Sequence, residues 1–244
     1  MDESGVRAIA ELEAKSLETE VDGIQFKARE MKPVIFEPRP EPLKLDSLSG
    51  LVELLTEPID EELRSAEDLL IHVESYREVA LYGKLHGKKR QRDLYASVRL
   101  NESLETFPFG NFISSEAFQI KLRSQFKSTE DIEFLLNFTS RLTVTDEIGT
   151  NDDGITQEVS LRRGMSGALT DKASSKPIVT LKPFRTFREI PQPESEFLFR
   201  MRAEEGKVPK LALFEADGGG WQLDAVQLIA DYFNEHLPNL KVVY

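Results

Sequence analysis

The sequence predicts an α+β fold with a mostly antiparallel sheet, an extended β-hairpin and helices grouped in separate parts of the chain. Apolar and polar residues alternate with period two at 78–100 and again in runs between 177 and 216. Apolar residues at helical spacing occupy 114–138 and about 222–236. Because strands and helices come in groups and not in regular alternation, a doubly wound parallel sheet is disfavoured.

The composition is that of a globular chain with an ordinary core. With 244 residues, 40% of them hydrophobic and 30% charged, the chain can bury roughly 70% of the surface that its unfolded form exposes. It has no cysteine, which excludes a disulfide framework and a cysteine nucleophile and fits a reducing cytoplasm. The three histidines, His72, His86 and His236, lack metal-ligand spacing. We therefore expect no metal and no cofactor.

The charge and hydropathy patterns restrict the class of partner. The net charge of −12 makes nucleic acid an unlikely partner, because phosphate contacts need clustered Lys and Arg. No apolar run approaches the length of a membrane span. The first residues lack the basic start and apolar centre of a secretory signal. We therefore expect a soluble intracellular protein without membrane contact.

The first 45 residues are expected to form an N-terminal segment outside the main domain. Residues 2–20 have apolar side chains at helical spacing, which predicts a helix or an arm. Several prolines then break regular structure between 31 and 44. The expected division is therefore an arm and Pro-rich connector at 1–45 and a single α+β domain at 46–244.

The domain is expected to begin with two short helices and the hairpin. Ser47 and Ser65 each precede an apolar series and are predicted N-caps. Two period-two runs within 78–100 predict the two strands of the hairpin. The loop between them, 84–92, has five bases and no acid. These bases are Lys84, Lys88, Lys89, Arg90 and Arg92.

The rest of the chain predicts two helices, a set of strands and a final helix. Helices are expected after Ser114 and after Ser128, each with a buried apolar side. The final helix is expected at about 222–236, before a short strand within 240–244. The Gly- and Ser-rich segment 164–176 is predicted to be a loop. The expected strands are about 141–148, 154–163, 177–190, 195–202 and 210–216.

The order of these elements resembles that of another class of fold. An N-terminal arm, an extended hairpin, a long helical segment and a mixed sheet follow one another in viral capsid-like shell proteins. The likeness is one of element order alone, and carries no function by itself.

Six short segments carry a resemblance to a known family. They are 94–98 (LYASV), 109–112 (FGNF), 130–132 (EDI), 183–190 (PFRTFREI), 197–200 (FLFR) and 213–221 (LFEADGGGW). Through these segments, residues from about 66 to 244 resemble the YfdQ-like family of uncharacterised phage and prophage proteins. The resemblance implies a phage or prophage origin, and work in the bacterial cytoplasm or on a phage particle. It implies no catalytic residue.

The corner before the final helix is one candidate site. Glu215 and Asp217 lie two residues apart at a strand end, and with a third carboxylate such as Asp224 they could hold Mg²⁺. No lysine follows the three glycines as a phosphate-binding loop requires. The alternative, which we favour, is a tight strand-to-helix turn in which Trp221 anchors the helix to the core.

Arginines on two neighbouring candidate strands form a second candidate site. Arg200 and Arg202 are expected to share a face with Leu198, and Arg185 and Arg188 lie on the preceding run. Such a row could bind phosphate or the carboxylates of a partner. The alternative is pairing with acids of the chain itself. These acids are Glu189, Glu194 and Glu196.

The basic loop of the hairpin is a third candidate. It could dock on the acidic segment 53–68 of a neighbouring copy, a head-to-tail contact that builds rings or shells when repeated. The alternative is a solvated tip whose lysines prevent edge-to-edge pairing.

These observations lead to an expected function. Ser166 does not lie in a G-x-S-x-G context, and no other nucleophile is evident, so we expect no enzyme. The leading hypothesis is a phage or prophage accessory protein that acts by binding or by homo-oligomeric self-assembly. One alternative is a counter-defence protein that captures a nucleotide or a host protein on the arginine-bearing face. A less favoured one is a Mg-dependent enzyme that uses Glu215 and Asp217.

Overall fold

The computed structural model of the chain divides it into two compact units, Met1–Glu41 and Pro42–Tyr244. In the first unit, β1 (Glu18–Val21), β2 (Ile24–Lys27) and β3 (Lys32–Pro33) form an antiparallel sheet. The structure describes residues 4–5, 7–8, 18–21, 24–27, 32–33, 41–87, 90–101, 106–140, 142, 147–152, 157–162, 169–174, 176–204 and 207–244.

The second unit contains a five-stranded mixed sheet in the order β14-β5-β6-β7-β4. The three central strands pair antiparallel, whereas β14 and β4 run parallel to their neighbours at the two edges. Its strands are β4 (Leu43–Leu45), β5 (Leu69–Ser75), β6 (Glu78–Gly83), β7 (Leu94–Arg99) and β14 (Lys241–Val243).

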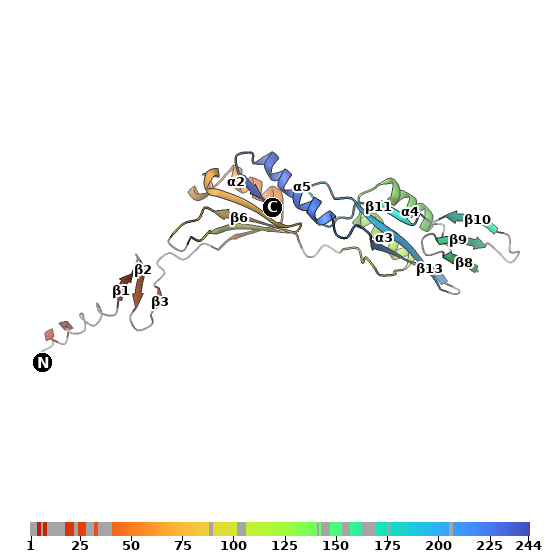
Figure 1. The fold of residues 1–244 in the computed structure, drawn as a ribbon, viewed down its shortest axis with the longest axis horizontal. Helices are drawn as coiled ribbons and strands as arrows, with labels where there is room; N and C mark the ends of the chain where they lie inside the picture. Colours follow the sequence, from red (N-terminus) through yellow and green to blue (C-terminus); the bar gives the residue numbers. More distant parts are fainter. Residues whose placement is uncertain are drawn as a thin grey trace. The chain divides into compact units, whose positions relative to one another are not determined.

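Two helices, α2 (Leu48–Thr56) and α5 (Trp221–His236), lie over one face of this sheet (Figure 1). The helix α2 begins where the side chain of Ser47 accepts a hydrogen bond from the Gly50 N–H, at 3.1 Å. This is the N-cap that the sequence predicts. Alternate residues of the strands face the helices and form a buried core with them. This core includes Leu48, Leu51, Ile71, Val73, Val79, Leu81, Val98, Ile229 and Phe233.

A second core lies between helices and a three-stranded antiparallel sheet. The strands β11 (Ile178–Leu181), β12 (Ser195–Glu204) and β13 (Lys207–Glu215) pair in sequence order. The helices α3 (Ser115–Gln125) and α4 (Glu130–Ser140) pack on one face of them. The core includes Phe118, Leu122, Leu135, Phe197, Phe199, Met201, Leu211 and Leu213.

The remaining elements are short. The strands β8 (Glu147–Asp152), β9 (Gln157–Arg162) and β10 (Leu169–Ser174) form a separate antiparallel sheet. Two 3₁₀ turns, η1 (Glu61–Leu63) and η2 (Ala66–Asp68), connect α2 to β5.

The predicted α+β class is confirmed, as are the hairpin strands β6 and β7 and the helices α3, α4 and α5. Three element predictions are wrong. The series after Ser65 is not a helix, because after η2 it becomes β5, in which Leu69, Ile71 and Val73 alternate inward. The strand expected at 177–190 ends at Leu181, and the chain beyond it is irregular.

The third wrong prediction concerns the segment 164–176, which includes β10 where a loop was expected. The segment was predicted to be a loop because it is polar, but its residues in β10 pair with β9.

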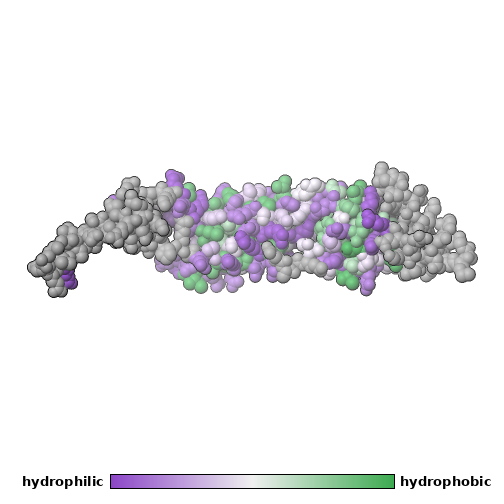
Figure 2. Space-filling model, turned by 90° about the horizontal axis from the view of Figure 1, so that it is seen from below, coloured by the Kyte–Doolittle hydropathy of each residue, from purple (hydrophilic) through white to green (hydrophobic). Residues whose placement is uncertain are grey.

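Of the residues that the structure describes, none belongs to a helix that is long and apolar enough to cross a bilayer. On the face seen in Figure 2, small hydrophobic patches lie between hydrophilic side chains.

Candidate functional site

Arg185 lies in the irregular chain after β11 and is the one buried charged side chain among the residues that the structure describes. Only 8% of the residue is exposed. Its Nη1 donates a hydrogen bond to Glu215 Oε1 at 2.6 Å, and its Nη2 donates to Ser195 Oγ. Glu215 is the last residue of β13 and Ser195 the first of β12, so the guanidinium joins the ends of two paired strands.

The guanidinium also stacks on an aromatic side chain. Its central carbon lies 3.8 Å from the ring centroid of Trp221, the first residue of α5. The rings of Phe109 and Phe197 are within 5.8 and 5.6 Å. Tyr76 packs edge-on against Trp221 with 4.7 Å between ring centroids. A cation over such rings gains electrostatic attraction when water is excluded.

Buried side chains hold the backbone that carries Arg185. Gln192 Oε1 accepts the Arg185 N–H at 3.1 Å, while Gln192 Nε2 donates to the Phe187 carbonyl at 2.8 Å. The Thr186 hydroxyl donates to the Tyr76 carbonyl at 2.6 Å. These bonds fix an irregular segment whose polar groups would otherwise be buried without partners.

Burial and neighbouring charges act in opposite directions in this cluster. Burial lowers the pKa of Arg185 from its ordinary value, while the negative charges of Glu215 and Asp217 oppose that change. The guanidinium nevertheless stays charged. Burial alone would raise the pKa of Asp217. Hydrogen bonds from Ser195 and the Gly219 N–H, together with the charge of Arg185, outweigh it and hold that pKa below its usual range.

The corner at Glu215 and Asp217 therefore contains a protein cation where a metal was considered. Asp224 is exposed on the first turn of α5. Within the part of the chain that the structure describes, no group of three or more His, Cys, Asp or Glu side chains is placed to hold a metal ion. The geometry favours the alternative of a structural turn.

The conformation of that turn agrees with this interpretation. Gly218 and Gly219 have φ of 63° and 84°, which side chains other than glycine rarely adopt. The Gly219 N–H donates to Asp217 Oδ1 at 3.0 Å. Trp221, at 5% exposure, begins the helix as the expected core anchor.

Part of the basic hairpin loop is engaged within its own chain. Lys84 Nζ lies 2.7 Å from Asp68 Oδ2, and Arg92 Nη1 donates to the Gly83 carbonyl at 2.9 Å. Arg90 is exposed and has a φ of 51°. Lys88 and Lys89 lie outside the described residues. One acid of the predicted docking segment thus already has a lysine of the same chain beside it.

Arg200 and Arg202 lie together on the side of β12 that faces away from α3 and α4. They share this side with Leu198, as predicted, because Phe197, Phe199 and Met201 are buried on the other side. Arg202 is directly opposite Lys210 of β13, and Leu198 is opposite Phe214.

An aromatic residue from the chain before α3 completes this surface. Phe112 precedes Ile113, which bridges to Leu211 of β13. Its ring lies 4.1 Å below the guanidinium carbon of Arg202 and 5.9 Å from the ring of Phe214. We call this surface the Arg–Phe face, defined as Phe112, Leu198, Arg200, Arg202, Lys210 and Phe214.

Two of the acids considered as partners for these arginines have other contacts. Glu189 Oε1 accepts the Leu48 N–H at 2.9 Å, and Glu194 lies 2.8 Å from Lys182 Nζ. Glu196 is exposed. Arg188 is not on the same strand face as Arg200 and Arg202. It lies in the irregular segment after β11, where its guanidinium carbon is 3.6 Å from the ring centroid of Phe184.

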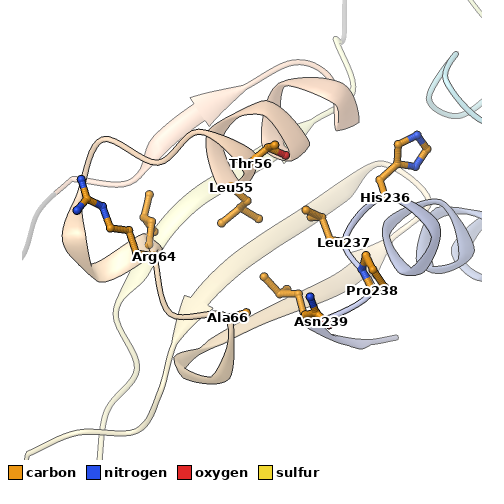
Figure 3. A pocket seen from close by; sticks show the side chains of 10 residues that line it. Leu55, Thr56, Arg64, Ala66, His236, Leu237, Pro238 and Asn239 are labelled. Atoms are coloured by element: carbon orange, nitrogen blue, oxygen red, sulfur yellow. The ribbon is translucent and has the colours of Figure 1, made fainter.

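A small hollow of about 250 Å³ lies between α2, η1 and the end of α5. Leu55 and Leu237 point into it, whereas the charged end of Arg64 and the ring of His236 point away from its centre (Figure 3). His236 Nδ1 is 2.8 Å from the Tyr232 carbonyl, and its ring stacks on that of Tyr232. Since its polar groups do not converge, the hollow resembles a gap in packing more than a ligand site.

Comparisons with family models, with curated proteins and with solved structures found no match for this chain.

Sequence reasoning missed three members of the Arg–Phe face. The outward positions of Lys210 and Phe214 could have been predicted from the sequence, because they alternate with the apolar residues Leu211 and Leu213, which are buried, along one strand. Phe112 had no such signal, because only the tertiary structure brings it beside β13. The roles of Ser195 and Gln192 around Arg185 were missed for the same reason.

Proposed function

We propose that this protein acts by binding or by homo-oligomeric self-assembly, and that it does not act by catalysis. The observation that carries the proposal is the Arg–Phe face, where Arg200, Arg202 and Lys210 lie beside Phe112 and Phe214 on the side of β12 and β13 that faces away from α3 and α4. Arginine and aromatic side chains are the residues that contribute most binding energy at protein interfaces.

The placement of the charges supports a binding role. Arg202 is exposed and lies directly opposite Lys210 across β12 and β13, in a chain whose net charge is −12. An exposed arginine of this kind favours an acidic partner. The partner we propose is another copy of this acidic chain.

The setting of this activity is also a proposal. The resemblance of 66–244 to phage and prophage proteins supports an accessory protein of a phage or prophage. Such a protein would work in the cytoplasm of the bacterial host or on the phage particle.

The first test is the native mass in solution. Light scattering after size exclusion should give a multiple of the 27.7 kDa chain mass at micromolar concentration. A mass that stays at 27.7 kDa up to about 100 μM, well above a typical specific affinity, would contradict self-assembly.

A paired variant then tests whether the Arg–Phe face is responsible. Arg202→Glu with Lys210→Glu should lower the mass toward that of the single chain. The matched control is Lys44→Glu with Lys241→Glu, which makes the same charge change at exposed positions of the five-stranded sheet. The control should keep the wild-type mass.

A second candidate function is supported by the stacking of Arg202 on Phe112. A cation beside an aromatic ring is suited to a nucleotide, which offers both a phosphate and a base. Capture of a nucleotide or of a host protein would then serve against host defence. A nucleotide present at a hundred times its Kd should raise the unfolding free energy by about 2.7 kcal/mol. A thermal-unfolding panel with no such shift in wild type would contradict nucleotide capture.

A further inference from the structure

We infer that the hollow between α2, η1 and the end of α5 is a docking site for a basic segment of another protein, which places one aliphatic side chain in the hollow. This surface is separate from the Arg–Phe face, and the inference does not rest on the self-assembly proposed above. It assigns a second interaction surface to the chain, with a partner of opposite charge.

The walls of the hollow are mostly apolar and leave room for a side chain. The volume of about 250 Å³ exceeds the roughly 150 Å³ of an apolar cavity that accepts a benzene ring. Leu55 and Leu237 point into the hollow, whereas the charged end of Arg64 points away from its centre (Figure 3). A leucine or isoleucine side chain therefore suits it better than a polar ligand. The apolar lining residues are Leu55, Leu63, Ala66, Leu237, Pro238 and Leu240.

An exposed isoleucine lies close to the hollow. Ile59 is 87% exposed, the highest fraction among the large hydrophobic side chains of the described structure. It is three residues from Thr56, which lines the hollow, so their Cα atoms are at most about 11 Å apart. A partner segment seated in the hollow would also cover Ile59 and remove its apolar surface from water.

Exposed acids surround the hollow along the chain. Seven of them lie within three residues of the lining, against two exposed bases, Arg64 and Lys241. Such an excess of negative charge around an apolar hollow attracts a segment that carries Lys and Arg. The seven acids are Glu53, Glu57, Asp60, Glu61, Glu62, Glu67 and Glu235, of which Glu57, Glu62, Glu67 and Glu235 are direct neighbours of lining residues.

The carboxylates of these acids are available to a partner. None of the seven side chains makes an ion pair or a hydrogen bond with another residue that the structure describes. Asp68 differs from them, because it lies 2.7 Å from Lys84 Nζ. The charge that selects a basic partner is therefore not neutralised within the described part of the chain.

The loop 57–62, which carries four of the acids, is held in position at both ends. The Glu57 N–H donates to the Glu53 carbonyl at 3.0 Å, which closes the last turn of α2. At the other end, Leu63 is 5% exposed, and its N–H donates to the Asp60 carbonyl at 3.2 Å. A surface fixed in this way loses little conformational entropy when it binds.

Another copy of this chain suits the hollow less well than a different protein. The chain has a net charge of −12, so a second copy brings more acids than bases to an acidic surface. In the basic loop of the hairpin, Lys84 already lies beside Asp68, and Arg92 donates to the Gly83 carbonyl at 2.9 Å. The partner class is therefore a basic protein with Lys and Arg around one exposed Leu or Ile.

The test uses the full chain and a labelled synthetic peptide in which one leucine is flanked by lysines and arginines. Fluorescence anisotropy measures its Kd. Serine in place of the leucine should raise the Kd roughly ten- to a hundredfold, as expected for an aliphatic side chain that leaves water on binding. Glutamine in place of the lysines and arginines should abolish binding. The inference is overturned if either replacement leaves the Kd unchanged, or if the first peptide does not bind up to about 100 μM.

Charge variants of the chain test where the peptide binds. Glu57→Lys with Glu62→Lys should raise the Kd about tenfold or more, because both acids adjoin the hollow. The matched control is Glu116→Lys with Glu196→Lys, which makes the same charge change at exposed positions of α3 and β12. The control should change the Kd less than about twofold. Equal losses in the two double variants would indicate general attraction to an acidic chain and would overturn the site.

A third variant tests the hollow itself without changing charge. Leu55→Ala should weaken the leucine peptide and leave the serine peptide unaffected, because only the leucine reaches the wall that Leu55 forms. Ile59→Ser gives a second reading at an exposed position, where folding is not at risk, and should also weaken the leucine peptide. Urea unfolding checks that both variants are folded. An unchanged Kd in the folded variants would overturn the seat proposed for the aliphatic side chain.

The native mass separates this inference from the proposed function. Glu57→Lys with Glu62→Lys should keep the mass of wild type, because the partner is not another copy. A lower mass in this variant would identify another copy as the occupant and overturn the inference. If wild type has the mass of one chain and still binds the peptide at the hollow, self-assembly is overturned while this inference stands.

Discussion

Arg185 and Arg202 make the same stacking contact in two very different surroundings. Each guanidinium lies over an aromatic ring, Arg185 at 3.8 Å from Trp221 and Arg202 at 4.1 Å from Phe112. Arg185 is buried with Glu215 at 2.6 Å, whereas Arg202 is exposed and faces Lys210. The two clusters lie toward opposite ends of β12 and β13.

The difference shows how surroundings assign a role to the same pair of residue types. Around Arg185, an acid and a hydroxyl accept the donors, so the cation contributes to the fold and has little left to offer a ligand. Around Arg202, the residue directly across the strand pair is Lys210 and the guanidinium is exposed, so an acidic partner can still reach it. A cation–aromatic pair in a sequence therefore does not identify a binding site until its acids are located.

The largest expected effect comes from removing the buried cation. Arg185→Met should lower the free energy of unfolding by about 2–4 kcal/mol, somewhat less than for a fully buried pair, because Glu215 keeps access to water. Urea unfolding followed by circular dichroism measures the loss. The control is Arg188→Met, an exposed arginine stacked on Phe184, which should cost less than about 1 kcal/mol. Equal losses in both variants would contradict a structural role specific to Arg185.

An intermediate effect is expected from Asp217, and it should depend on pH. The depressed pKa of Asp217 means that its stabilising contribution is present above the unfolded-state value of about 3.9 and is lost as pH falls through the folded-state pKa. Asp217→Asn should therefore cost about 1 kcal/mol at pH 7 and progressively less in acid. Urea midpoints at several pH values between 7 and 3 measure this convergence with wild type.

The control for that experiment is Glu53→Gln, an exposed residue of α2. Its stability should run parallel to that of wild type across the same pH range. If Asp217→Asn also ran parallel to wild type, the ionised Asp217 would not stabilise the turn.

The smallest effect on stability is expected at the exposed cluster. Arg202→Met should change the free energy of unfolding by less than about 1 kcal/mol, because an exposed surface cation contributes little to stability. The same variant should weaken assembly in sedimentation velocity. A large loss of stability together with an unchanged sedimentation coefficient would reverse the roles assigned to the two arginines.

Tryptophan fluorescence can distinguish the effects of substitutions at Arg185 and at Arg202. Trp221 is the only tryptophan of the chain, so its emission reports on the Arg185 cluster. Arg185→Met should shift the emission of the folded chain, whereas Arg202→Met should leave it unchanged. A shift in Arg202→Met would show that the two clusters are coupled.

Much of the fold was accessible from residue patterns because the patterns reflect local physics. Ser47 was predicted as an N-cap and a helix was expected after Ser114, and both serine side chains accept a backbone N–H of the first helical turn. The period of two in 94–99 placed alternate residues of β7 inside. Prediction failed after Ser65, since leucines and a valine fit a helix and a buried strand equally well over so few residues.

The candidate sites were predicted less completely than the fold. The alternation that set Arg200 and Arg202 on one face is a property of any strand and needed no partner. The pairing of Arg185 with Glu215 joins residues 30 positions apart, and no local pattern encodes it. The exposure of Ile59 was equally hidden, because an apolar residue among acids is compatible with either side of a loop.

The sequence by itself determined the α+β class, most of the helix starts, the inward and outward sides of strands such as β7 and β12, and the acidity of the chain. These follow from interactions between residues close in sequence and from the charges alone. Only the tertiary structure decided that Arg185 is buried as part of the fold and that Arg202 is exposed on the surface. That choice depends on which acids and rings from distant segments reach each guanidinium, and burial then makes one contact strong while water weakens the other.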